Sequence, residues 1–207
     1  MARGDAVREI LNGRMDELNP TTKTILESVP DETVRKAYAK LLELGLTDEK
    51  IATRAYLLSM NPETLQRNAD SLKQFGLSNE KIASQAHLLG RDPETIQRNY
   101  EFLRRFFSKD EIMENAQLLG SSQKTIESSV QFLAQLGIDY KEMPFACGTK
   151  ASTKRKKIAV LLREKYGFNA NLSKEERKEL AEKARDFVRS RPQVLRMSEK
   201  KIKEKYC

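Results

Sequence analysis

Apolar residues recur at helical spacing along this chain, and the pattern itself repeats about every thirty residues. In the segment that begins at Thr64, the residues at i, i+4, i+7 and i+10 are Leu65, Ala69, Leu72 and Phe75. Such spacing predicts an α-helix with one apolar stripe. Four matching segments begin 31, 31 and 30 residues apart, at Thr33, Thr64, Thr95 and Thr125.

Between these helices lies a second set of related segments, which begin at Thr47, Ser78 and Ser108. Each copy places Ile, Ala and Leu at helical core positions, as at Ile51, Ala55 and Leu58. Each repeat is therefore expected to contain two helices. Because a two-helix repeat cannot bury its apolar stripe alone, neighbouring repeats must stack. The predicted fold class is all-α, with two-helix repeats of about 30 residues stacked into a curved solenoid or superhelix.

Residues that begin and end helices flank the apolar stripes. Side chains able to cap a helix N-terminus stand at Thr47, Asn61, Ser78, Asp92, Ser108 and Ser122. Pro62 and Pro93 follow their caps directly, at a position where the missing N–H costs nothing. Gly45, Gly76 and Gly137 stand at the opposite ends, where a left-handed residue is common.

Polar residues also recur, as the triplet Gln-Arg-Asn in two of the helices. Arg67 and Arg98 lie about 200° around the helix from its first core position, so they should face away from the packing side. Lys36 holds the same register before them, and the column of cations stops at Ser128. Amide side chains accompany the column at Gln66, Gln97, Asn68 and Asn99, and the two asparagines are expected nearer the edge of the core. Aligned cations suit a long polyanion; the alternative is a soluble helix face copied by duplication.

Charge is unevenly distributed along the 207 residues, whose net charge is +8. Residues 1–140 carry 18 Lys and Arg against 21 Asp and Glu, a net of −3. Residues 141–207 carry 20 against 9, a net of +11. Such asymmetry indicates a polyanionic partner, either nucleic acid or an anionic membrane surface. A solvated basic tail is the other interpretation that composition leaves open.

Composition also bounds where the protein works. A charged content of 33% and a mean hydropathy of −0.65 are typical of a soluble protein, and no apolar run approaches the roughly 18 residues of a membrane span. The first stretch contains acidic residues and no apolar segment of signal-peptide type. We expect a cytoplasmic or nucleoid-associated protein, and an organellar one only if a targeting segment is missing from this chain.

The basic part of the chain begins near residue 145, which divides a helical-repeat solenoid at 1–144 from a basic helical region at 145–207 that continues it. A helix capped by Ser152 or Thr153 is expected there, and its first turns hold four consecutive cations. Cations at a helix N-terminus oppose the helix dipole, but a bound phosphate would reverse that cost. The cluster therefore indicates nucleic-acid contact, against a solvated face or a nuclear-import signal.

The last helix is expected to be capped by Ser198, with lysines surrounding Ile202. The segment that contains it, RPQVLRMSEKKIKEKY, resembles the recurring signature of the mitochondrial transcription termination factor (mTERF) family. In that signature, a proline-leucine segment ends one helix and a serine-capped Glu-Lys-x-Ile helix opens the next. The repeat length and the helix ends QFLAQLGI and LLELGL are similar too, so the resemblance covers about residues 30–206.

This resemblance implies a half-ring helical superhelix whose positively charged concave side holds double-stranded DNA or, in some members, RNA, with a role in organellar gene expression. We accordingly expect a monomeric nucleic-acid-binding protein that favours duplex DNA, with structured RNA as the other possibility, and that regulates transcription or another step of gene expression. Phosphate contacts should dominate its affinity. The candidate binding residues are Lys36, Arg67, Arg98, Lys154, Arg155, Lys156, Lys157, Arg163, Lys200, Lys201 and Lys203.

The sequence does not indicate an enzyme, a cofactor or a metal site. The single histidine, His87, stands where neighbouring repeats have Tyr56 and Gln117, so a helix-surface position is expected. The two cysteines, Cys147 and Cys207, form no zinc-ligand pattern and no disulfide framework. The alternative function is a protein-interaction scaffold, in which the solenoid holds a peptide or helix and the basic region is a tail.

Overall fold

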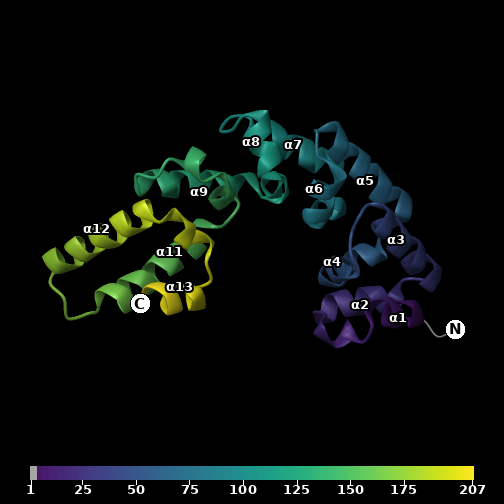
Figure 1. Cartoon of the computed structure of the whole chain (residues 1–207), viewed down its shortest axis with the longest axis horizontal. Coiled ribbons are helices and arrows are strands. Elements are labelled where there is room, and N and C mark those ends of the chain that lie inside the picture. Colours follow the sequence, from purple (N-terminus) through teal and green to yellow (C-terminus); the bar gives the residue numbers. More distant parts are fainter. Residues whose placement is uncertain (1–3) are drawn as a thin grey trace. The chain divides into compact units, whose positions relative to one another are not determined.

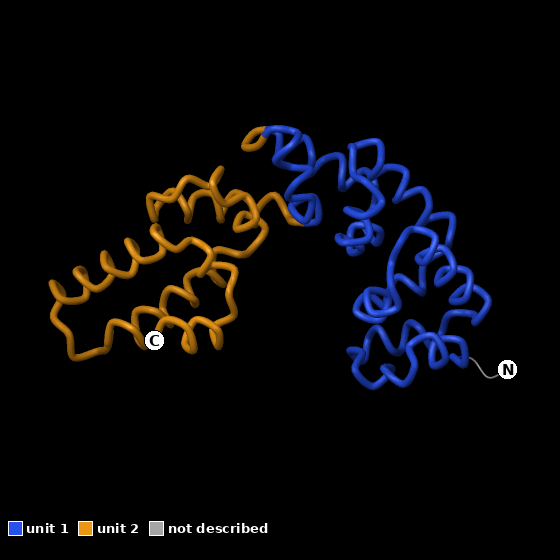
Figure 2. The backbone as a smooth tube through the Cα atoms, viewed as in Figure 1, with its two compact units in different colours: residues 1–104, 108–120 blue, residues 105–107, 121–207 orange. Residues whose placement is uncertain are grey.

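The computed structural model describes residues 4–207, and every regular element within that range is a helix (Figure 1). The chain forms two compact units (Figure 2), of which unit 1 holds residues 1–104 and 108–120 and unit 2 holds residues 105–107 and 121–207. The predicted all-α class of stacked helical repeats is confirmed. The boundary at residue 145, indicated by composition, lies inside unit 2 and stays a prediction.

Unit 1 is built from two layers of helices. Its α-helices are α1 (Asp5–Leu11), α2 (Pro20–Ser28), α3 (Asp31–Glu43), α4 (Asp48–Thr53), α5 (Pro62–Gln74), α6 (Asn79–Ser84), α7 (Pro93–Leu103) and α8 (Lys109–Glu114). Its 3-10 helices are η1 (Arg14–Glu17), η2 (Ala55–Ser59), η3 (Ala86–Gly90) and η4 (Ala116–Gly120). In one layer, α3 packs on α5 and α5 packs on α7 (Figure 1). In the other layer, the 3-10 helices η2, η3 and η4 follow the short helices α4, α6 and α8 along the chain.

The helix boundaries follow the predicted caps. The side chains of Thr47, Asn61, Ser78, Asp92, Ser108 and Ser122 each accept a hydrogen bond from a backbone N–H in the first turn. Ser108 and Glu111 complete a reciprocal capping box. Gly45, Gly76 and Gly137 all have positive φ where the chain leaves a helix, as their positions predicted.

The first helix of each repeat is not continuous, which the sequence did not predict. At Arg54 the backbone turns to φ −127° and ψ 35°, and the α-helix gives way to the 3-10 helix η2. An unbroken α-helix from Ile51 would bury Ala55 and Leu58 but turn Leu57 outward. The break rotates the next turn so that both leucines are fully buried. The same break recurs before η3 and η4.

The asparagines of the repeated triplet hold the two layers together. The seventh residue of α5, Asn68, is buried and its Nδ2 donates to the carbonyl of Leu89 at 2.7 Å. The seventh residue of α7, Asn99, donates in the same way to Leu119 at 2.7 Å. Both carbonyls belong to the fourth residue of a 3-10 helix, near a helix end that leaves carbonyl groups without partners. Asn68 and Asn99 are therefore structural residues and do not belong to the exposed column.

Unit 2 extends the same pattern with larger departures. Its α-helices are α9 (Gln123–Gln135), α10 (Pro144–Cys147), α11 (Ala151–Val160), α12 (Lys174–Ser190) and α13 (Glu199–Tyr206). Shorter elements are the 3-10 helices η5 (Tyr140–Glu142) and η7 (Pro192–Arg196) and the π-helix η6 (Leu161–Lys165). Ser198 caps α13 as predicted, and Ser173 forms a capping box with Glu176 at the start of α12. The predicted cap of α11 is wrong, because that helix begins at Ala151 and no side chain caps it.

Candidate nucleic-acid interface

Three of the predicted cations occupy equivalent positions on neighbouring helices of unit 1. Lys36, Arg67 and Arg98 are the sixth residues of α3, α5 and α7, and all three are exposed. Because α3 packs on α5 and α5 on α7, the three cations occupy the same position on successive helices of one layer. We call this set the unit 1 column.

Two members of the unit 1 column already have polar side-chain partners. The Nζ of Lys36 lies 2.7 Å from the Oε1 of Glu32, which raises the pKa of the lysine through a hydrogen bond and charge attraction. The guanidinium of Arg98 donates to the Oγ1 of Thr95 at 3.1 Å. A phosphate at these sites would therefore compete with contacts already present, at least for Lys36.

Unit 2 repeats the same register, which the sequence reading missed. Ser128 and Lys156 are the sixth residues of α9 and α11, so the cation lost at Ser128 returns on the next helix of this type. Lys156 is exposed. The signal was Thr153 followed three residues later by Lys156, as Thr64 is followed by Arg67, but lysine at the core position between them hid the match.

That core position is Lys154, and its predicted contact with phosphate is wrong. Lys154 is the fourth residue of α11 and is 0% exposed, where the equivalent residues of α3, α5, α7 and α9 are buried and apolar, namely Val34, Leu65, Ile96 and Ile126. Its Nζ donates to the Oγ of Ser129 at 2.7 Å and also to the carbonyl of Thr149. Burial lowers the pKa of Lys154 from 10.5 to about 8.

The amine of Lys157 also makes a hydrogen bond within the fold. Lys157 is the seventh residue of α11, the position of Asn68 and Asn99, and its Nζ donates to the carbonyl of Leu195 at 2.6 Å. Leu195 is the fourth residue of η7, so the contact reproduces the tie between layers seen in unit 1. Burial lowers the pKa of this half-buried lysine. The prediction that Lys157 contacts nucleic acid is therefore corrected, because its amine already donates to a backbone carbonyl.

The remaining predicted cations of unit 2 are exposed and lie on α11, η6 and α13. Helix α13 packs against α11 and η6, with Ile202 buried beneath it. The carboxylate of Glu164 joins two cations from these elements, with Arg163 Nη2 at 2.7 Å and Lys203 Nζ at 3.0 Å from its Oε1. Both cations lower the pKa of Glu164, first through their hydrogen bonds. One carboxylate therefore holds two cations close together, which leaves the cluster net positive.

Further exposed cations surround this cluster, at Arg155, Lys156, Lys200 and Lys201. Lys200 lies 3.8 Å from Glu204, at the edge of ion-pair distance, with its side chain 86% exposed. Lys165, which the sequence reading did not single out, joins η6 to α13 by donating to the carbonyl of Tyr206 at 2.9 Å. We call Arg155, Lys156, Arg163, Lys200, Lys201 and Lys203 the unit 2 cations.

The two compact units differ strongly in net charge. Unit 1 contains 16 Lys and Arg against 19 Asp and Glu, a net of −3. Unit 2 contains 22 against 11, a net of +11. All of the excess positive charge of the protein therefore belongs to unit 2, and a polyanion should be attracted there.

The side chain of His87 packs against the next 3-10 helix, so the predicted helix-surface position is corrected. It is half-buried against Gly120 of the next 3-10 helix, where an added Cβ would lie 2.8 Å from Nε2. Tyr56 lies in the same way over Gly90. Burial, with Arg54 and Arg91 nearby, lowers the pKa of His87. A neutral, packed histidine without a partner carboxylate gives no support for catalysis.

Residues 4–207 contain neither a metal-binding cluster nor a membrane-spanning helix. No group of three or more His, Cys, Asp or Glu side chains in that range could hold a metal ion. None of the helices described is both long and apolar enough to cross a membrane. Both cysteines are free thiols, with Cys147 buried and Cys207 exposed.

Comparison with known proteins identifies the family of this chain. No curated protein matches the chain. Residues 32–182, about three quarters of the chain, match the mTERF family. The match runs from α3 through most of α12 and so includes both the unit 1 column and the core of unit 2. Members of this family are nucleic-acid-binding factors of helical-repeat architecture, and the chain belongs to the mTERF family.

Proposed function

We propose that this protein binds duplex DNA, or structured RNA, mainly through phosphate contacts made by unit 2. The observation that carries the proposal is the separation of charge between the units, −3 against +11. Excess positive charge on one compact unit attracts the phosphate backbone whatever its base sequence. The exposed unit 2 cations are the residues that would make these contacts.

In this proposal, the unit 1 column contributes less to duplex binding than unit 2 does. Arg67 and Arg98 are exposed and aligned, but they belong to a unit whose net charge is negative. Phosphate contacts from these two arginines would help to fix the orientation of the bound duplex. Acting as a monomer, the protein would regulate transcription or another step of gene expression by occupying the duplex.

The test compares three neutralised lysines of α13 with three neutralised lysines elsewhere. A variant with Lys200→Gln, Lys201→Gln and Lys203→Gln should bind a labelled DNA duplex at least about tenfold more weakly by fluorescence anisotropy. The slope of log affinity against log salt should fall by up to about 3, since each phosphate contact contributes about 0.9. The matched variant changes the exposed residues Lys50, Lys73 and Lys109 of unit 1 to Gln, so it loses the same charge.

The two variants separate a local surface from net charge. If both lose affinity equally, binding depends on total charge and the assignment to α13 is wrong. If the wild-type protein binds neither duplex DNA nor structured RNA at low salt, the proposed function itself fails.

A further inference from the structure

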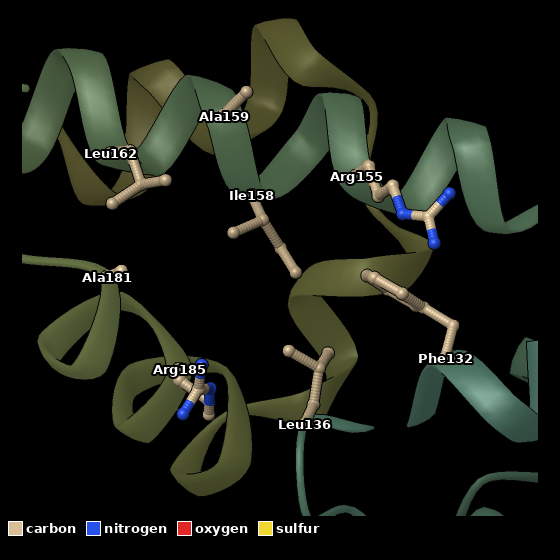
Figure 3. Close-up of a pocket in the computed structure, with 8 residues that line it drawn as sticks. All are labelled: Phe132, Leu136, Arg155, Ile158, Ala159, Leu162, Ala181 and Arg185. Carbon is tan, nitrogen blue, oxygen red and sulfur yellow. The ribbon is translucent and has the colours of Figure 1, made fainter. Parts of the chain in front are cut away.

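An apolar pocket in unit 2 shares only Arg155 with the unit 2 cations. It lies between α9, α11 and α12 and has a volume of about 200 Å³ (Figure 3). Its walls come from Phe132 and Leu136 at the end of α9, Ile158 of α11, Leu162 of η6 and Ala181 of α12. Ile158 and Leu162 are only partly buried, so aliphatic surface remains open to a ligand.

Two arginines stand on opposite sides of this apolar surface (Figure 3). Arg155 of α11 lies over the ring of Phe132, with its guanidinium carbon 5.1 Å from the ring centroid. Arg185 of α12 donates to the carboxylate of Glu182 at 2.8 and 3.0 Å, and its side chain is 33% exposed. An occupant of the pocket would therefore have a cation on each side of its apolar group.

The volume and lining decide what kind of group fits. Pockets that enclose a whole small molecule measure roughly 300–1,000 Å³, so about 200 Å³ suits a single side chain. A nucleobase would fit poorly, because apart from the two guanidinium groups the lining side chains are apolar and would leave its carbonyl groups and ring nitrogens without partners. An aliphatic or aromatic side chain has no polar group that would be left without a partner.

We propose that the pocket binds a partner protein through a short amphipathic segment, which inserts one leucine or phenylalanine and places carboxylates near Arg155 and Arg185. The apolar side chain supplies the anchor, and the paired charges select acidic segments over basic ones. The site goes beyond nucleic-acid binding, because it lets one unit hold a protein partner while other cations of the unit contact phosphate.

The experiment uses the full chain and labelled helical peptides. The probe peptide has a central leucine with glutamates one helical turn before and after it, and a second probe has phenylalanine at the centre. Matched peptides replace the leucine by alanine, or the glutamates by lysine. Either probe should bind by fluorescence anisotropy, and the alanine peptide should bind at least about tenfold more weakly because the anchor is lost.

Substitutions in the protein test whether the peptide binds in the pocket. Ala181→Leu fills the pocket with a good helix former, so peptide affinity should fall at least about tenfold while duplex binding stays unchanged. Ala39→Leu, at an exposed alanine of α3, is the matched control and should change neither. Arg155→Gln with Arg185→Gln should remove the preference for the glutamate peptide over the lysine peptide.

Each other outcome overturns the proposal. Binding of neither probe below about 1 mM would show that the pocket takes no such segment. Peptide binding that survives Ala181→Leu would place the peptide elsewhere. Displacement of the peptide by single-stranded DNA, together with loss of that DNA's binding in Ala181→Leu, would make the pocket part of the nucleic-acid surface. Duplex binding is measured separately, so failure here leaves the proposed function standing.

Discussion

Replacing Lys154 by methionine is expected to stabilise unit 2 at neutral pH. The position is apolar in the four earlier helices of this type, and methionine keeps the length of the lysine stem. Removing the amine leaves no polar group without a hydrogen bond, because the Oγ of Ser129 donates directly to the carbonyl of Thr149 at 2.6 Å. The substitution therefore removes a buried cation whose hydrogen-bond partners are a hydroxyl and a carbonyl, and it leaves the remaining hydrogen bond intact.

The size of the effect follows from the pKa of Lys154. A pKa held at about 8 in the folded protein, against 10.5 ordinarily, means that folding disfavours the charged form by about 3 kcal/mol at 1.36 kcal/mol per pKa unit. Below pH 8 the wild-type protein carries the full cost. Between pH 8 and 10.5 the unfolded chain binds more protons than the folded one, so wild-type stability from this group rises with pH.

The advantage of Lys154→Met should therefore depend on pH. Allowing for the lost amine contacts, we expect the free energy of unfolding to rise by about 1–3 kcal/mol at pH 7 and by less than about 1 kcal/mol at pH 10. The neighbouring thiol of Cys147 does not interfere, because burial raises its pKa to about 11 and keeps it neutral over most of this window. Lys157, whose charge also acts on Lys154, is unchanged in both proteins.

Urea unfolding followed by circular dichroism at both pH values measures the difference, and hydrogen exchange of α9 and α11 amides locates it. A useful second variant, Ser129→Asn with Lys154→Leu, restores the combination found at Asn68 and Leu65. It should be at least as stable as the single variant. A destabilised Lys154→Met protein would refute the reasoning, because the lysine would then be contributing packing or hydrogen bonds that exceed its desolvation cost. A gain equal at pH 7 and pH 10 would also refute it, because the cost would then not come from the charge of the lysine.

Three further changes test the packing and the column. Asn99→Leu should cost about 1–3 kcal/mol in urea unfolding, because the carbonyl of Leu119 loses its donor, whereas the neighbouring Arg98→Gln should cost little; equal losses would contradict the structural role of the asparagine. Gly120→Ala should cost about 1–3 kcal/mol, because its Cβ meets the imidazole of His87, and His87→Ala should relieve most of that cost in a double-mutant cycle; additive effects would contradict the contact. Arg67→Glu with Arg98→Glu should weaken duplex binding while the helical circular dichroism spectrum stays unchanged, and retained affinity would remove the unit 1 column from the binding surface.

The repeat architecture was predictable because its signals are local. Caps such as Asn61, prolines such as Pro62 and glycines such as Gly76 act within one helical turn, so reading them requires no knowledge of the partner helix. The break at Arg54 was not predictable in this way. It results from burying both Leu57 and Leu58, which is decided by the layer against which they pack.

The errors at Lys154 and Lys157 have a different origin. In a run of four cations, composition cannot separate the side chain that reaches solvent from the one that enters the core. Only the register of α11 assigns Lys154 to a leucine position and Lys157 to an asparagine position. Long lysine stems can occupy such positions because the amine reaches a distant carbonyl, as at Thr149 and Leu195.

The repeated triplet therefore combines two constraints of different kinds. Its asparagine is held by packing, since the seventh position supplies a donor to a carbonyl in α5, α7, α9 and α11 alike. Its arginine is not, because the sixth position accepts Ser128 in α9 without loss of the fold. Since no contact between the layers requires a cation there, recurrence of Arg67 and Arg98 has to be explained by duplication or by a ligand, and the effect of charge reversal on duplex affinity distinguishes the two.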